Sequence, residues 1–373
     1  VVEDGVIAEY GPMEQFKYAS SPRVVLKDNC CVLPAWCDSH THLIFAEPRE
    51  QEFVGKIKGR SYAEIAAAGG GILQSAKKLS EASEDFLFVE AWKRLMDVAG
   101  LGTGAIEIKS GYGLTLESEL KMLRVIKKLK EKSSLLIKST FLGAHAFPPA
   151  FQDKHDGYID VLLNEMLPAI AAENLADYID VFCETGFFSP GEMEIICKEA
   201  SRYNMKPKLH VNQLNSIGGV ESGIQLKALS LDHLENLDEK DIEMLGLFEG
   251  ASTLLPTASF FLRMQYAPAR QLLEAGAAIA LASDFNPGSS PSGNMNFVVS
   301  LACIQMTLLP EEAINAATFN GACAMEIQNE AGSIAKGKRA NLIFTNPVPS
   351  LAYLPYSFGR NEIDKVMING SFL

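Results

Sequence analysis

Two histidines close a strand-like stretch of the chain, Cys31-Val-Leu-Pro-Ala-Trp-Cys-Asp-Ser-His-Thr-His-Leu43. In an extended chain, residues two apart project from the same face, so the imidazoles of His40 and His42 can reach one metal ion. A catalytic zinc or iron site needs about three or four such ligands, with one position left open. Two surface histidines in a loop would give the same pattern, so the metal interpretation depends on the rest of the chain.

The composition is that of an ordinary globular protein. Of its 373 residues, 47% are hydrophobic and 21% are charged. Length alone suggests about two or three domains, although α/β barrels of this size form one unit. The net charge of −13 argues against nucleic acid and anionic membranes as partners. No run of about 18 apolar residues is present, so we expect no membrane span, and no secretory signal is visible.

The cysteines favour a reducing compartment. None of them forms a Cys-x-x-Cys pair, and most lie in apolar segments, which fits free thiols better than a disulfide framework. We therefore predict a cytoplasmic protein. The chain begins at Val1 without methionine, so we expect a short N-terminal piece, which could include a leader, to precede it. The seven cysteines are Cys30, Cys31, Cys37, Cys183, Cys197, Cys303 and Cys323.

The two ends of the chain are rich in short strands. Glu3-Asp-Gly5 predicts a hairpin turn that leads into a strand. Strand patterns occur at Val6–Tyr10, Ala340–Phe344 and Lys365–Gly370. We therefore predict one small β domain that is built from both termini, residues 1–33 and 336–373.

The middle of the chain alternates between strand-like apolar runs and amphipathic stretches such as Glu117–Lys132. Eight strands that alternate with helices predict parallel pairing, and eight is the number that closes a (β/α)8 TIM barrel. We predict an α/β fold of this type over residues 34–335, with the active site at the carboxyl ends of the strands. The eight runs end near His40, Ser110, His145, Glu184, Gln213, Glu235, Pro256 and Asp284.

Polar side chains gather at these predicted strand ends. Five of the six histidines fall there, and only His155 does not, so we interpret it as a surface residue. Any one histidine is usually a hydrogen-bonded core residue, but five at the same end of one barrel favour a shared site. The full set is His40 and His42 (first strand), Lys109 and Tyr112 (second), His145 (third), Glu184 (fourth), His210 and Gln213 (fifth), His233 (sixth) and Asp284 (eighth).

Three loop features have more than one interpretation. Gly69-Gly-Gly71 could be a phosphate cradle, but no Gly-Lys-Ser/Thr follows, so a tight loop near the mouth of the site fits better. Arg49 could hold a substrate carboxylate in a fork geometry or be an ordinary surface arginine. Ser283–Ser290 combines a carboxylate with a turn rich in Gly, Pro and Ser, whose backbone groups are free to meet a ligand.

With these residues placed, the chain resembles the amidohydrolase superfamily, which carries His-x-His on strand 1, His on strands 5 and 6, and Asp on strand 8. Within it, the chain is similar to the imidazolonepropionase family over essentially its whole length. The motifs Glu107-Ile-Lys-Ser-Gly-Tyr-Gly-Leu and Ser283-Asp-Phe-Asn-Pro-Gly-Ser are far more specific than the His-x-His. The other matching segments are Asp38-Ser-His-Thr-His-Leu, Gly59-Arg-Ser-Tyr-Ala-Glu-Ile-Ala, Gly69-Gly-Gly-Ile, Thr140-Phe-Leu-Gly-Ala-His-Ala and Asp232-His-Leu-Glu.

The resemblance implies a metal-dependent hydrolase with zinc or iron, a small-molecule substrate and a homodimer. The metal ligands that it implies are His40, His42, His210 and Asp284. The residues that would hold 4-imidazolone-5-propanoate or its open-ring product are Arg49, Tyr112 and His145, with Asn286, Gly288 and Ser289 around the ligand. Tyr62 would add a substrate contact, Gln213 falls where the family has Glu or Gln, and His233 would support the metal or act in catalysis.

One position departs from the family pattern. Asn212 in His210-Val-Asn-Gln213 stands where the family usually has Asp, and loss of a charge beside the ligands could weaken metal binding. Two-metal members of the superfamily bridge their ions with a carboxylated lysine on strand 4. Here that strand, 178–184, has none, and Lys109 and Lys138 lie on other strands. We therefore expect one ion per chain.

The implied reaction hydrolyses the cyclic amide C–N bond of the imidazolone ring and gives N-formimidoyl-L-glutamate, an intermediate of histidine degradation. A bound divalent metal can lower the pKa of water from about 15.7 to near 7. Asp284 would take the proton of this water and hand it to the leaving nitrogen. The further assignments are His233 to the carbonyl or the water, His145 or Gln213 to the ring, and Arg49 to the propionate.

Two alternatives use the same fold. A mononuclear amidohydrolase that deaminates a purine, pyrimidine or related ring would need nearly the same metal ligands. The pocket discriminates between them, because an arginine aimed at a carboxylate favours the propionate substrate. A non-catalytic scaffold is disfavoured, since such proteins lose metal ligands and this chain keeps all four.

Overall fold

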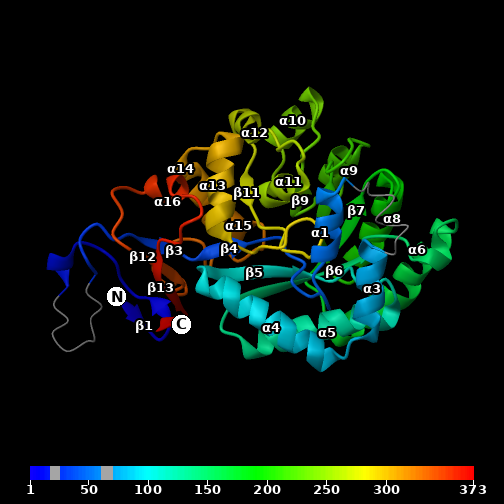
Figure 1. Ribbon diagram of the computed structural model, residues 1–373, viewed down its shortest axis with the longest axis horizontal. Helices are drawn as coiled ribbons and strands as arrows, with labels where there is room; N and C mark the ends of the chain where they lie inside the picture. Colours follow the sequence, from blue (N-terminus) through cyan, green and yellow to red (C-terminus); the bar gives the residue numbers. More distant parts are fainter. Residues whose placement is uncertain (17–25, 60–69) are drawn as a thin grey trace.

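The computed structural model describes residues 1–16, 26–59 and 70–373 (Figure 1). Its centre is a sheet of eight parallel strands whose order in the sheet follows their order in the chain. The strands are β4 (Trp36–Asp38), β5 (Thr103–Lys109), β6 (Leu136–Ala144), β7 (Tyr178–Cys183), β8 (Lys206–Val211), β9 (Ser230–His233), β10 (Ala251–Leu254) and β11 (Ile279–Leu281). All eight predicted strands are therefore present.

The sheet curls into a nearly closed barrel. Among the described residues, β4 and β11 are the neighbours that share no ladder, and their chains meet just beyond the strand ends. There the backbone N–H of Asp284 donates to the carbonyl of His40 (3.0 Å), and the N–H of His42 donates to the carbonyl of Phe285 (2.9 Å). Thr41 and Phe285 form a parallel bridge at the same place. This arrangement confirms the predicted (β/α)8 barrel.

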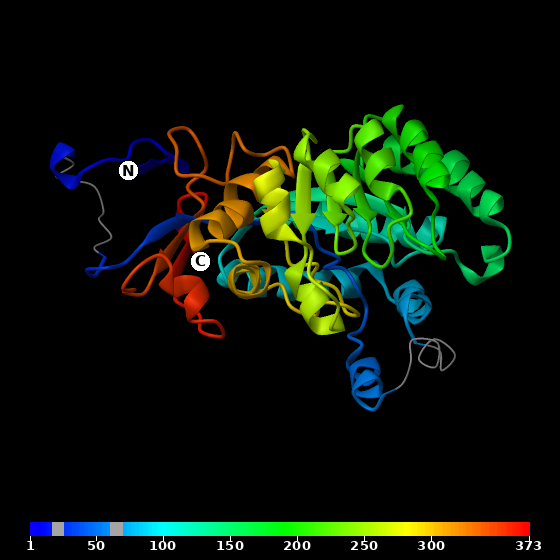
Figure 2. The same cartoon turned by 90° about the horizontal axis from the view of Figure 1, so that it is seen from above.

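Helices alternate with the strands and cover the outer side of the barrel (Figures 1 and 2). The longer ones are α1 (Glu50–Ile57), α3 (Ile72–Glu81), α4 (Glu84–Gly100), α5 (Leu116–Lys132), α8 (Pro190–Ser201), α10 (Glu239–Gly246) and α13 (Met295–Met306). The shorter ones are α6 (His155–Val161), α7 (Leu167–Glu173), α9 (Gly219–Gln225), α11 (Pro256–Leu262), α12 (Ala269–Ala275), α14 (Pro310–Asn315), α15 (Gly321–Cys323) and α16 (Tyr353–Tyr356). The described ranges also contain short 3₁₀ turns (Met13–Gln15, Pro149–Phe151) and π-helical turns (Leu162–Met166, Ala316–Asn320).

Helix α5 follows from its sequence within one residue of the predicted start. The side chain of Thr115 accepts a hydrogen bond from the N–H of Ser118 and so caps the first turn. Acidic residues lie in the first turn and lysines in the last, which complements the helix dipole. The apolar face of the helix is buried against α4 and β6. The stretch Glu117–Lys132 is therefore confirmed as an amphipathic helix.

The two termini meet in a small antiparallel sheet. Its strand order is β14 (Ser371–Phe372), β13 (Ile363–Ile368), β12 (Leu342–Thr345) and β3 (Val32–Pro34). Strands β1 (Val2–Glu3) and β2 (Val6–Ile7) form the predicted hairpin, although the strand ends at Ile7 and not at Tyr10. Both views show the blue N-terminal and red C-terminal segments together at one end of the molecule (Figures 1 and 2).

Two further expectations concern the chain as a whole. Every helix in the described ranges is too short or too polar to span a bilayer. All seven cysteines are free thiols, as the sequence predicts.

Candidate active site and metal centre

Four side chains from three strands meet at the carboxyl ends of the barrel strands. His40 and His42 follow β4, His210 belongs to β8, and Asp284 follows β11. The Oδ1 atom of Asp284 lies 3.6 Å from the Nε2 atom of His40 and 3.6 Å from that of His42. The Nε2 atoms of His40 and His210 are 3.1 Å apart. All four side chains are buried. Ligand atoms of His40, His42 and Asp284 lie within 4.8 Å of one another, as do those of His40, His210 and His233, so each group can hold a metal ion.

Carboxylates orient two of these imidazoles from behind. The Nδ1 atom of His40 lies 2.6 Å from Asp232, and the Nδ1 atom of His210 lies 2.8 Å from Asp180. Each Nδ1 therefore donates its proton to a carboxylate, which leaves each Nε2 as an acceptor. Two acceptor nitrogens only 3.1 Å apart repel each other unless a cation lies between them. The chemistry of these donor atoms therefore fits a metal ion.

The protonation of the cluster agrees with this fit. Burial and the neighbouring positive charges hold the pKa of His40, His42 and His210 well below the ordinary histidine value. The three imidazoles are therefore neutral, which is the form that binds a metal. Burial raises the pKa of Asp284 to about 6, although Asn286 and Ser289 donate hydrogen bonds that oppose this effect.

His233, at the end of β9, lies beside the cluster. Its ring centroid is 5.1 Å from that of His210, and its Nδ1 atom lies 3.4 Å from a carboxylate oxygen of Glu235. Burial lowers the pKa of His233, but the charge and hydrogen bond of Glu235, together with the charges of Asp284 and Asp232, outweigh burial, so the pKa lies above its ordinary value. His233 can therefore donate a proton or a hydrogen bond into the site.

The opposite wall of the site carries Arg49, Tyr112 and His145. The rings of His42 and His145 stack at 5.3 Å, and the guanidinium of Arg49 lies 5.7 Å from the centre of the Tyr112 ring. The Nε atom of Arg49 donates to Ser75 (2.8 Å), while its Nη2 atom is buried without a partner among the described residues. A side-chain carbon at Gly288 would lie 2.4 Å from Nη1, so glycine leaves the space that this guanidinium occupies.

The loop after β11 is built around one amide. The Oδ1 atom of Asn286 accepts the backbone N–H groups of Gly288 and Ser289, both at 2.8 Å. The Nδ2 atom of Asn286 donates to the carbonyl of Asp284 (2.7 Å) and to the hydroxyl of Ser289 (2.6 Å). The Ser289 hydroxyl in turn donates to Oδ2 of Asp284 (3.1 Å). Asn286 therefore shapes the loop, and Ser289 orients the carboxylate.

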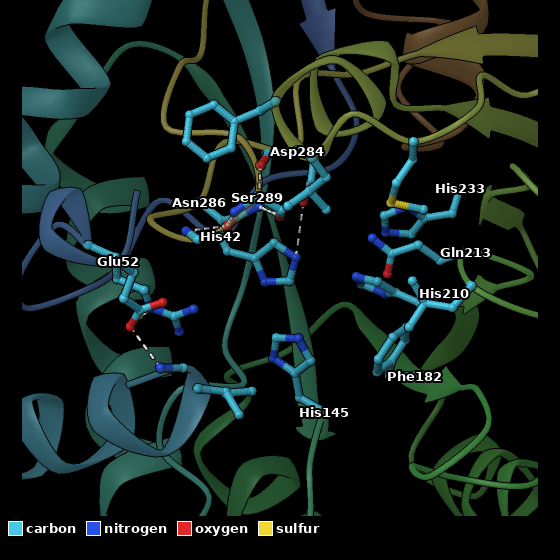
Figure 3. Close-up of a pocket in the computed structure, with 18 of the residues that line it drawn as sticks. His42, Glu52, His145, Phe182, His210, Gln213, His233, Asp284, Asn286 and Ser289 are labelled. Atoms are coloured by element: carbon cyan, nitrogen blue, oxygen red, sulfur yellow. Dashed lines mark hydrogen bonds and ion pairs between the residues drawn. The ribbon is translucent and has the colours of Figure 1, made fainter. Parts of the chain in front are cut away.

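One cavity of about 660 Å³ opens onto these groups. In Figure 3, His42 and His145 on one side face His210, His233 and Gln213 on the other. Of the predicted site residues, the cavity wall includes His42, Arg49, Tyr112, His145, His210, Gln213, His233, Asp284, Asn286, Gly288 and Ser289. His40 lies behind this wall, and Tyr62 lies outside the described residues. Of the predicted loop Gly69-Gly-Gly71, Gly71 lines the cavity, and Gly69 lies outside the described residues.

Two of the predicted strand-end residues, Glu184 and Lys109, stabilise the barrel and its loops and do not line the cavity. Glu184 accepts the backbone N–H groups of Leu214 (2.8 Å) and Asn215 (3.1 Å), which fixes the loop that carries Gln213. Lys109 points into the barrel, where it pairs with buried carboxylates. His155 lies on the surface, as predicted, with a side chain that is 41% exposed.

The side chain of Asn212 hydrogen-bonds groups other than the proposed metal ligands. Its amide nitrogen donates to the carbonyl of Asn236 (2.9 Å) and to Asp241 (3.2 Å), at the start of α10. Strand β8 ends at Val211, and Asn212 has a φ of 55°, so its side chain leaves the face that carries His210. The carboxylate that contacts His210 is Asp180.

Asp180, Asp232 and Lys56 were not assigned to the site from the sequence. Asp180 interrupts the apolar run of β7, and Asp232 directly precedes His233 in β9. A charged residue inside a buried strand is the signal that could have found both aspartates, because such a group needs a partner. Lys56 lines the cavity from α1, and its ammonium lies 3.4 Å from the carbonyl of Gly288.

Comparisons with known proteins agree with this geometry. A sequence model of the amidohydrolase family matches residues 183–373. The imidazolonepropionase of Flavobacterium johnsoniae is 55% identical over all of this chain and 91% of its own length, and that of Parabacteroides distasonis is 42% identical over 99% of this chain and 89% of its own.

Solved structures share the fold at low identity. A triazine hydrolase variant superposes with a TM-score of 0.75 at 15% identity and covers all of this chain and 88% of its own. The guanine deaminase of E. coli has a TM-score of 0.72 at 13% identity and covers all of this chain and 90% of its own. The chain therefore belongs to the amidohydrolase family and, within it, to the imidazolonepropionases.

Proposed function

We propose that this protein hydrolyses the cyclic amide C–N bond of 4-imidazolone-5-propanoate and releases N-formimidoyl-L-glutamate, a step of histidine degradation. Its relatives at 40–55% identity carry the name of this enzyme. The observation that carries the proposal is the buried Nη2 of Arg49, which has no partner among the described residues and lies in the wall of the cavity that holds the histidine and aspartate cluster. A substrate with a carboxylate at one end and a hydrolysable ring at the other fits this pair of features.

We propose His40, His42, His210 and Asp284 as the ligands of one zinc or iron ion per chain. Three imidazoles and a carboxylate suit either metal. A bound divalent ion supplies a Lewis acid that lowers the pKa of water to near neutrality, to about 7. No lysine is present on β7, which supports a single ion, since the bridged pair of two-metal relatives uses a lysine there.

Asp284 is the proposed proton carrier. The attacking water gives a proton to its carboxylate, and the carboxyl group returns that proton to the ring nitrogen as the C–N bond breaks. Ser289 donates a hydrogen bond to Oδ2 of Asp284, so the other oxygen, Oδ1, faces His40 and His42. This arrangement holds the carboxylate in one orientation through both proton transfers.

The remaining polar groups are proposed to bind and polarise the substrate. His233 can donate to the ring carbonyl, because its pKa lies above the ordinary value. The Nδ1 atom of His145 is engaged by the carbonyl of Gly111 (3.1 Å), which leaves its Nε2 atom for the ring. Gln213 offers an amide from the opposite wall, and Arg49 with Tyr112 holds the propionate.

The homodimer, the cytoplasmic location, the domain limits 1–33 with 336–373 and 34–335, and a substrate contact by Tyr62 remain predictions of the sequence and the resemblance. The cavity and the family support a small-molecule substrate.

The decisive assay follows the absorbance of imidazolone propionate with metal-loaded protein, chelated protein and the His40→Ala variant. We expect loss of absorbance with the loaded protein alone, together with formation of one equivalent of N-formimidoyl-L-glutamate. Purine and pyrimidine rings should release no ammonia under the same conditions. Ammonia release from such a ring, with the imidazolone left intact, would overturn the proposal in favour of a deaminase.

A further inference from the structure

A cluster of buried charges lies inside the barrel behind the proposed metal ligands. Lys109, at the end of β5, is completely buried. Its ammonium lies 2.8 Å from Glu107, 2.9 Å from Asp180 and 3.8 Å from Asp232. A second lysine, Lys208 of β8, is equally buried and lies 3.5 Å from the other oxygen of Glu107. Three carboxylates thus share two ammonium groups in the interior.

Two of these carboxylates also contact proposed metal ligands. The oxygen of Asp180 that pairs with Lys109 is Oδ2, which also accepts from Nδ1 of His210. The oxygen of Asp232 nearest Lys109 is likewise Oδ2, which accepts from Nδ1 of His40. One ammonium therefore lies beside both of the oxygen atoms that fix these imidazoles.

The buried carboxylates need the ammonium of Lys109 for two reasons. Two carboxylates that lie near one cation inside a protein repel each other strongly if the cation is removed, because the interior screens charge poorly. A buried carboxylate without a cation is also unfavourable by itself. Burial alone would lower the pKa of Lys109, but Asp180, Glu107 and Asp232 outweigh it and raise the pKa, so the lysine stays charged.

We propose that Lys109 is a positioning residue of the metal centre, which holds Asp180 and Asp232 so that His40 and His210 direct their Nε2 atoms at one point. Lys109 is not among the residues that line the cavity, so its effect passes through the two aspartates. The inference rests on the metal site proposed above and is independent of the identity of the substrate.

Lys208 provides a matched control. It is also fully buried and also pairs with Glu107, but its other contacts are the hydroxyl of Ser230 (2.7 Å) and the carbonyl of Ala324 (3.1 Å). The Ser230 hydroxyl donates to Oδ1 of Asp232 (2.6 Å), so Lys208 reaches one of the two aspartates, and only through this hydroxyl. Lys109→Met and Lys208→Met therefore remove the same charge from the same interior, and only the first removes the ammonium beside the aspartates.

The test measures zinc dissociation constants and the unfolding of the metal-free protein for wild type and both variants. We expect both variants to lose stability without metal, because each removes one ammonium from a group of buried carboxylates. Zinc affinity should fall by about 10- to 100-fold in Lys109→Met. A loss of this size is typical when a residue that supports a metal ligand from behind is removed. In Lys208→Met the affinity should stay within about threefold of wild type, which is a change of less than ~1 kcal/mol.

A charge-compensated double variant keeps the test informative if Lys109→Met alone does not fold. Glu107→Gln combined with Lys109→Met removes one carboxylate together with the ammonium, so the net charge of the cluster is unchanged. Zinc affinity should remain weakened in this double variant, because the contacts to Asp180 and Asp232 are still lost. Wild-type affinity in the double variant, or equal losses in Lys109→Met and Lys208→Met, would overturn the inference. Absence of both zinc and iron binding in the wild type would instead refute the metal site itself.

Discussion

The guanidinium of Arg49 is only partly satisfied by the protein. Its Nε atom is fixed by Ser75 and its face lies over Tyr112, whereas Nη2 is buried without a partner among the described residues. A buried donor without an acceptor is unfavourable by about 1–3 kcal/mol. A ligand carboxylate would supply the missing acceptor, so the free protein is already arranged for an anionic group at this point.

Replacement of this residue should separate recognition from chemistry. Arg49→Met keeps much of the apolar stem but removes the bidentate donor. Loss of one partner of a desolvated charge pair costs about 2–5 kcal/mol, or roughly 30- to several-thousand-fold in kcat/KM. Metal content should not change. If the propionate also positions the substrate ring at the proposed metal centre, kcat should fall and KM should rise.

The control for this change is Arg124→Met, which removes a guanidinium from an exposed pair with Glu173. It should leave kcat/KM unaltered. An analogue without the carboxylate should be processed about equally poorly by wild type and Arg49→Met. A kcat/KM for Arg49→Met within about threefold of wild type would place the carboxylate elsewhere and reopen the deaminase alternative.

The proposed metal ligands should lose metal and turnover together. His40→Ala and His210→Ala each remove an imidazole whose Nε2 faces the other at 3.1 Å. The loss of metal affinity should exceed the roughly 10- to 100-fold that removal of an outer partner causes. Elemental analysis and kcat on the same samples check this, and His155→Ala, at the surface, is the control. A variant with full metal content and full activity would exclude that histidine from the site.

The meeting of the strand ends could be predicted from the sequence, whereas the backbone conformation of a single residue could not. His40, His42, His210 and Asp284 could be predicted together, because parallel strands bring their carboxyl ends to one side. Asn212 could not be placed by alternation, since a positive φ turns its side chain away from His210. A single left-handed residue after a strand is not visible in a hydrophobic pattern.

The connection between β5 and α5 is organised by one carboxylate. Glu119, in the first turn of α5, is buried and accepts the backbone N–H groups of Gly111 (3.1 Å), Gly113 (2.7 Å) and Leu114 (2.9 Å). These bonds fold the loop around Tyr112. At Gly113 a side-chain carbon would lie 2.4 Å from the N–H nitrogen of Glu119, so the turn requires glycine.

Removal of this carboxylate should loosen the substrate wall but not the metal centre. Glu119→Ala leaves three buried N–H donors unpaired, at about 1–3 kcal/mol for each group that finds no water. We expect lower stability to urea and a raised KM, because Tyr112 is no longer held beside Arg49. Metal content should equal that of wild type. Glu117→Ala, on the exposed side of the same turn, should change neither quantity. An unchanged KM in a destabilised Glu119→Ala would show that Tyr112 does not bind substrate.

Whole elements were easier to predict than the contacts between them. The periodicity of Glu117–Lys132 and the eight apolar runs identified α5 and the barrel strands, since burial of one face repeats along the sequence. The ion pairs of Lys109 join strands β5, β7 and β9. These strands are not neighbours, since β6 and β8 lie between them. Which of their side chains meet inside the barrel depends on the register of the whole sheet, which the sequence of one strand does not contain. For this reason Lys109 was placed at the right strand end but not in its cluster.

The barrel as a whole is weakest at its seam. Strands β4 and β11 lack a ladder, and a few bonds replace it among the described residues. The N–H and hydroxyl of Ser283 both donate to the carboxylate of Asp38, the first at 3.0 Å. Two of the proposed metal ligands follow β4 and one follows β11. An ion bound by them would join the two edges of the sheet.

Removal of the metal should therefore act on the seam first. A metal at 100 times its Kd stabilises the folded state by about 2.7 kcal/mol, so chelation should lower Tm by several degrees. Amide hydrogen exchange should accelerate at residues 37–42 and 283–285, whose protection depends on the bonds between the two edges. The ladder between β6 and β7, far from the seam, is the internal control. Re-addition of zinc or iron should restore both Tm and protection. An equal acceleration in all strands would mean that the ion stabilises the barrel globally, and no acceleration at 37–42 would mean that the seam closes without it.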